Sequence, residues 1–73
     1  MNVYAITAHG EYCGGMAVVA AATEQEARAL ANLSRDSQTG LSIDYATPGS
    51  CAELLPCTYE GEPRLLAIHE EGE

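Results

Sequence analysis

The chain has 73 residues, and its eleven Asp and Glu against three Arg and no Lys give a formal net charge of −8 at pH 7. A chain of this length forms one small domain, so we expect a single domain over residues 1–73. Phosphates require a basic footprint, which excludes direct binding to nucleic acid, and no apolar run reaches the roughly 20 residues of a membrane span.

The first ten residues, MNVYAITAHG, lack the basic segment that opens a signal peptide. We therefore expect a cytoplasmic protein whose cysteines stay reduced. The chain contains no Phe and no Trp, so its hydrophobic core must be thin. A thin core favours a stabilising metal, a disulfide or a second subunit.

The start of the chain predicts a β-hairpin. Residues 3–8 (VYAITA) alternate between two faces, which predicts a first strand. A glycine-bearing turn over residues 9–15 connects it to residues 16–22, an uncharged run with two central valines. Such a run is typical of a strand that is covered on both faces.

A helix is predicted after the hairpin. Thr23 and Glu26 have the spacing of a capping box, in which the Thr23 hydroxyl accepts from the amide of Glu26 and the Glu26 carboxylate accepts from the amide of Thr23. The spacing of apolar residues over 24–33 predicts an amphipathic helix that packs on the sheet. Its buried side chains are expected to be Ala27, Leu30 and Ala31.

The segment after the helix predicts a third strand. Residues 37–40 are expected to end the helix, with Gly40 just past its last turn. Strict alternation over residues 41–45 (LSIDY) then predicts a half-buried strand with Ser42 and Asp44 facing water.

The last part of the chain predicts a helical turn and a final strand. Ser50 and Glu53 form a second capping box, which predicts a short helical turn through Leu55 that Pro56 ends. We expect the rest of the chain to form a short strand, a turn, a last strand and a frayed acidic tail, over residues 58–59, 60–63, 64–69 and 70–73 in that order. The predicted fold is α+β: a small, mainly antiparallel sheet in β-β-α-β order with a further helical turn and a C-terminal strand, and one main helix on one face.

A zinc site is one interpretation of the four soft or borderline ligands His9, Cys13, Cys51 and Cys57. A tetrahedral site needs about that number, and metal binding would stabilise a thin core. Their spacing misses the pattern of most structural zinc sites, however, and cysteines in a small cytosolic chain are more often buried as hydrophobic residues. In an oxidising compartment Cys51 and Cys57 would instead form a local disulfide.

Thiol chemistry is a second interpretation of these cysteines. Cys13 lies four residues after His9, which is compatible with a thiolate and its base, but no third group orients them. Cys51 is the stronger candidate, because the first turn of a predicted helix would favour its thiolate. None of these patterns is specific to a reaction, so we expect no enzyme and no cofactor other than the alternative zinc.

The negative charge is concentrated in the second half of the chain. Residues 1–43 carry four carboxylates against two Arg, a balance of −2, whereas residues 44–73 carry seven against one, a balance of −6. Complementary fields speed encounter with a basic protein, although the same carboxylates also keep a small domain in solution. The expected partner contacts are four carboxylates and one aromatic anchor, namely Asp44, Glu53, Glu60, Glu62 and Tyr59.

The opening stretch VYAITAHGEYCGGMAVVAAATEQEARALA, residues 3–31, resembles the start of small proteins encoded by phages, prophages and other mobile elements. Small acidic proteins of this kind include anti-CRISPR proteins, several of which resemble nucleic acid in charge and plug basic channels of effector complexes. The resemblance implies an inhibitor that acts in the cytoplasm of a host cell. No functional residue carries over, because the shared pattern is structural.

The sequence therefore favours an acidic protein–protein interaction module that binds a basic surface, for which a nucleic-acid-binding complex is one candidate partner. The alternative is a zinc-stapled or thiol-active domain that uses the four residues named above. A homo-oligomer that pairs through a sheet edge or an Ala-rich face is compatible with either hypothesis.

Overall fold

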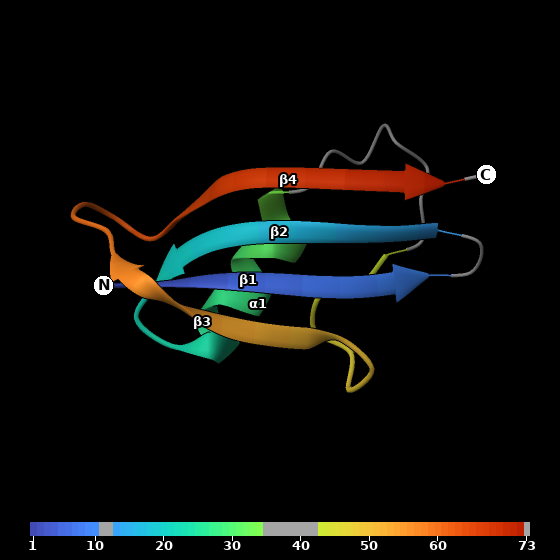
Figure 1. Cartoon of the computed structure of the whole chain (residues 1–73), viewed down its shortest axis with the longest axis horizontal. Coiled ribbons are helices and arrows are strands. Elements are labelled where there is room, and N and C mark those ends of the chain that lie inside the picture. The colour runs from blue at the N-terminus through green and yellow to red at the C-terminus, as the bar shows by residue number, and fades with distance from the viewer. Residues whose placement is uncertain (11–12, 35–42, 73) are drawn as a thin grey trace.

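The structure, a computed structural model, describes residues 1–10, 13–34 and 43–72. Its elements are β1 (Asn2–Gly10), β2 (Cys13–Ala21), α1 (Glu24–Ser34), β3 (Cys51–Thr58) and β4 (Arg64–Gly72). The four strands form one sheet in the order β3-β1-β2-β4, and every neighbouring pair is antiparallel. The helix α1 lies across one face of this sheet (Figure 1). The predicted α+β fold is confirmed at this level.

The predicted hairpin is the centre of the sheet. In β1, Tyr4, Ile6 and Ala8 point toward α1, and the register sets Tyr4 opposite Val19 and Ile6 opposite Ala17. Directly opposite residues share a face, so the helix-facing side of both strands is apolar and buried. The prediction that the second strand is covered on both faces is wrong, because Met16 on the other face is 47% exposed.

The predicted helix is confirmed, and its capping box holds its first turn. The amide of Glu26 donates to the Thr23 hydroxyl at 3.1 Å. The Glu26 carboxylate accepts from the amide of Ala22 at 3.1 Å, one residue earlier than predicted. The predicted packing face is also confirmed, since Ala27 and Ala31 are fully buried and Leu30 packs against the core.

The segment 43–50 replaces the predicted third strand. Ile43 and Tyr45 are buried and Asp44 is exposed, so the alternation was predicted correctly, but these residues are not part of the sheet. The amide of Tyr45 donates to the Asn32 side-chain oxygen at 2.8 Å, a partner on the helix instead of a neighbouring strand. Residues 41–42 of the predicted strand lie outside the described residues.

Arg28 fastens this segment to α1. Its guanidinium donates to the carbonyl oxygens of Tyr45 at 3.1 Å and Thr47 at 3.4 Å, and also to the Ser50 hydroxyl. The Glu24 carboxylate one turn earlier holds the Nε atom at 3.3 Å. One planar side chain thus satisfies several acceptors of a loop that has no strand neighbour.

Strand β3 replaces the predicted helical turn over residues 50–55. The Ser50 hydroxyl lies 2.7 Å from the Thr47 carbonyl oxygen and accepts from Arg28, so it does not cap a helix. Pro56 lies within β3 at the edge of the sheet, where the β1–β3 register shifts between Asn2 and Tyr4. An edge strand with a bulge tolerates the missing amide of proline.

The tail predicted over residues 70–73 is wrong for residues 70–72, because β4 continues through Gly72; Glu73 lies outside the described residues. Glu70 pairs with Gly15 and Glu71 with Gly14 on β2. The Tyr45 hydroxyl donates to the Glu70 carboxylate at 3.0 Å, which ties this end of β4 to the core.

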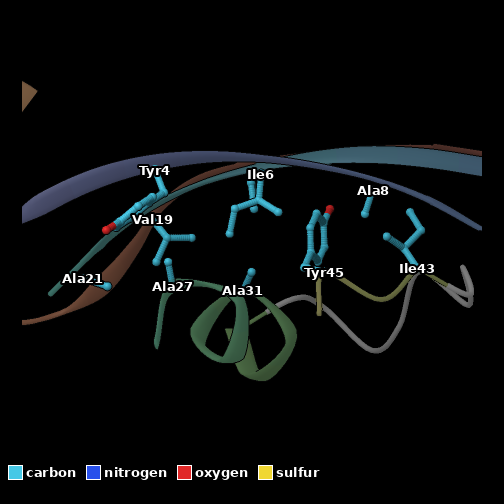
Figure 2. Close-up of a cluster of buried hydrophobic side chains, with 10 residues drawn as sticks. Tyr4, Ile6, Ala8, Val19, Ala21, Ala27, Ala31, Ile43 and Tyr45 are labelled. Atoms are coloured by element: carbon cyan, nitrogen blue, oxygen red, sulfur yellow. The ribbon is translucent and has the colours of Figure 1, made fainter. Parts of the chain in front are cut away.

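The core is one thin layer between the sheet and α1 (Figure 2). Tyr45 is its largest fully buried side chain. In Figure 2 the side chains of Tyr45 and Ile43 reach up to the sheet beside the helix. The fully buried side chains of α1 are only the small Ala27 and Ala31, with Leu30 partly buried against the core. The loop thus supplies the bulk that the alanines of the helix lack.

Gly15 is required by this close packing. A Cβ atom at residue 15 would lie 2.5 Å from the Tyr45 hydroxyl and 2.9 Å from Cγ of Glu70, whereas a Cβ at Gly49 would meet nothing within 4 Å. We expect Gly15→Ala to lower the free energy of unfolding by about 1–3 kcal/mol. Gly49→Ala should leave it nearly unchanged. Urea denaturation measures both effects. The loss of stability caused by Gly15→Ala should be smaller in a Tyr45→Phe background. Equal stability of the two alanine variants would contradict this packing.

Replacing Arg28 should also lower the free energy of unfolding of the domain. We expect Arg28→Ala to cost about 2–4 kcal/mol, because it leaves half-buried carbonyls and a buried hydroxyl without their donor. Arg28→Lys should recover only part of this loss, since an ammonium does not form the same planar fork. Arg64→Ala at an exposed position is the control and should change stability by less than about 0.5 kcal/mol. Equal effects of the two alanine substitutions in a thermal melt would refute the role of Arg28.

Candidate interaction surface

The face of the sheet opposite α1, here called the open face, has no covering layer among the described elements. Figure 1 looks onto this face, with α1 behind the strands. Its centre is formed by side chains of β1 and β2 that alternate with the buried ones: Ala5, Thr7, Met16 and Val18. Met16 is exposed and the other three are half-buried, so a mainly apolar strip lies open along the two central strands.

One end of the open face is closed by the β3–β4 connection. Val3 and Ala20 face away from α1 and oppose each other, yet they are only 4% and 0% exposed. Figure 1 shows the end of β3 passing in front of the start of β1 there. The main chain of Met1 exchanges two hydrogen bonds of 2.9 Å with Tyr59, which fixes the connection over this end.

The connection itself is a tight turn around Gly61. Gly61 has a φ of +134°, a conformation that residues with a side chain rarely adopt. A Cβ there would lie 3.0 Å from the Tyr59 ring, so the ring packs against the glycine. Tyr59 is therefore half-buried within the turn, while Glu60 and Glu62 on either side of Gly61 are exposed.

Carboxylates surround the apolar strip but do not enter it. Described residues of β1 and β2 include no Asp or Glu. Glu53 of β3 is opposite Ala5, and Glu71 of β4 is opposite Gly14, so both belong to the open face on its two edges. We call the exposed set of Glu53, Glu60, Glu62 and Glu71 the acidic rim.

Further polar side chains on this face include His9, opposite Gly14, and Arg64, opposite Ala20, together with Cys51 and His69. Cys51 is opposite Thr7, and His69 is opposite Met16, and both are exposed. The His69 Nε2 atom lies 3.0 Å from the Glu71 carboxylate, with both side chains largely in solvent. An ion pair this exposed contributes little to stability.

Asp44 is separate from the other predicted contacts. It lies in the loop that packs beside α1, where its carboxylate accepts from the Asn32 side chain at 2.7 Å and from the amide of Ala46 at 2.9 Å. The Ala46 amide and the Asn32 side chain hold the pKa of Asp44 below its usual value, because they stabilise the charged form. Its local role is to shape the loop.

The other predicted contacts gather around the open face. Glu53 lies on it, and Tyr59, Glu60 and Glu62 lie in the connection that closes one end. Two residues of this surface were missed. Met16 was predicted to be covered together with the rest of residues 16–22, and Glu71 was assigned to a frayed tail.

The four predicted zinc ligands are not brought together. Cys51 and Cys57 lie near opposite ends of β3, and six residues of extended strand span about 20 Å. Neither a disulfide nor one shared zinc ion can bridge that distance. Among residues 1–10, 13–34 and 43–72, no three His, Cys, Asp or Glu side chains cluster in a way that could hold a metal.

The thiol interpretation loses its structural basis at Cys51, and the side chain of Cys13 lies outside the described part of the structure. Cys51 begins a strand, so no helix N-terminus favours its thiolate. His9 is exposed at the end of β1, with its ring beside Gly14. Both cysteines of β3 are free and exposed.

No family model, curated protein or solved structure matches this chain. Within the described part of the chain no helix has the length and apolar character needed to cross a membrane.

Proposed function

We propose that this protein is an acidic, non-catalytic interaction module that binds a basic surface of another protein. The observation that carries the proposal is the acidic rim around a mainly apolar strip. A polar rim around an apolar centre is the usual anatomy of a protein–protein interface. The rim supplies charge for recognition, and the strip supplies surface for burial.

Among the described residues, few positive charges compensate the carboxylates of this surface. Of the two arginines in the described residues, Arg28 donates its hydrogen bonds to the loop beside α1. Arg64, at the start of β4 and opposite Ala20 on the open face, is the single exposed arginine in those ranges, whereas the acidic rim has four carboxylates. A basic partner would meet a field that attracts it over about 8–10 Å at physiological salt.

The resemblance of residues 3–31 to phage and mobile-element proteins suggests the setting. In that setting the proposed partner is a basic surface of a host nucleic-acid-handling complex, and the protein is an inhibitor of the anti-CRISPR type that acts in the host cytoplasm. Complexes that handle nucleic acid expose basic channels, and these offer the complementary charge.

A charge-matched pair of variants tests the proposal. Glu60→Gln/Glu62→Gln and Ala29→Lys/Leu33→Lys each raise the net charge by two, but the first changes the rim and the second changes exposed positions of α1. In capture from bacterial lysate we expect wild type to recover a partner at about 50 mM salt and to lose it at about 500 mM. The rim variant should recover much less, and the helix variant should behave as wild type.

Two results would contradict the proposal. Recovery that does not change with salt would exclude a charge-driven interface. Equal loss in both variants would show that net charge, and not the rim, determines recovery. Circular dichroism and a thermal melt of each variant confirm that the fold is retained.

A further inference from the structure

The open face has the width of one α-helix. Its edge strands, β3 and β4, are separated by three strand spacings, about 14 Å in all. An α-helix with its side chains is about 10–12 Å across. The sheet already accepts one helix, α1, on its other face (Figure 1).

The floor of the open face suits a helix with an apolar stripe. The register lines up Ala5, Val18 and Ala67 across three strands, and sets Met16 between Thr7 and His69 in the next row. The row of small residues forms a shallow floor, and the exposed, flexible thioether of Met16 stands beside it.

The two edges carry charge in the position that such a helix requires. Glu53 lies on the β3 edge and Glu71 on the β4 edge, on opposite sides of the strip. Lys and Arg side chains on the flanks of a helix lay their alkyl stems on apolar surface and extend their charges outward. A helix lying along the strip would direct such charges toward both glutamates.

We propose that the open face is a docking site for a single basic amphipathic α-helix of the partner protein. This inference rests on the proposed function and specifies its partner. A second copy of this chain is disfavoured as the occupant, because face-to-face packing would bring two acidic rims together in a dimer of two chains of charge −8.

Designed peptides test the docking site directly on the wild-type protein. The probes are three peptides of about 18 residues: one of Leu and Lys with Leu along one helical face, one with Ser in place of every Leu, and one with Glu in place of every Lys. We expect the Leu/Lys peptide to bind, the Ser/Lys peptide to bind at least about tenfold more weakly and the Leu/Glu peptide not to bind.

Amide NMR shifts locate the binding. The Leu/Lys peptide should shift the resonances of open-face residues, Ala5, Thr7, Met16 and Val18, more than those of the exposed side of α1. Met16→Thr/Val18→Thr should weaken binding at least about tenfold. Met16→Gln, at an exposed position, should weaken it less but measurably, and Leu33→Gln on α1 is the matched control that should not change it.

The outcomes separate the docking site from the proposed function. Equal affinity for the Leu/Lys and Ser/Lys peptides, shifts centred on α1, or no binding of either basic peptide would overturn the docking site. If lysate capture still depended on Glu60 and Glu62, the proposal of an acidic module would be retained and the proposal of a helical partner would be rejected. Failure of that capture as well would refute both.

Discussion

The fold depends on how a sheet of four strands is covered by a helix of only eleven residues. The buried face of α1 is largely alanine, so the helix brings little volume to the core. Tyr45 and Ile43 supply the missing volume from the following loop, and Arg28 and Asn32 hold that loop against the helix through hydrogen bonds. The loop has no strand partner, so these side chains are what keeps its buried backbone satisfied.

This arrangement of the helix and the loop leaves the second face of the sheet available. The helix and the loop both pack on one side, and the β3–β4 connection closes only one end of the other side. What remains is a mainly apolar strip on β1 and β2, without described carboxylates, between edges that carry them. The distribution follows from topology: the acidic second half of the chain forms both edge strands, while the nearly neutral hairpin forms the centre.

Local signals were sufficient for the first half of the fold. The alternation in β1 and the capping box of Thr23 and Glu26 act within a few residues, so sequence spacing alone predicted the hairpin and the helix. The second half was mispredicted where long-range contacts override local ones. Ser50 and Glu53 have capping-box spacing, but the Ser50 hydroxyl is engaged by Thr47 and by Arg28, 22 residues away, and pairing with β1 makes the segment a strand.

The candidate site was predictable in its chemistry and not in its arrangement. Three of the four rim carboxylates were named from charge alone, whereas Asp44 belongs to the loop beside α1 and Met16 emerges only from the register.

The most direct test is hydroxyl-radical footprinting of the protein with its captured partner. A docking site on the open face predicts that labelling of Met16 falls on binding while that of Leu33, 81% exposed on α1, stays constant. Protection of Leu33 with Met16 still reactive would contradict it.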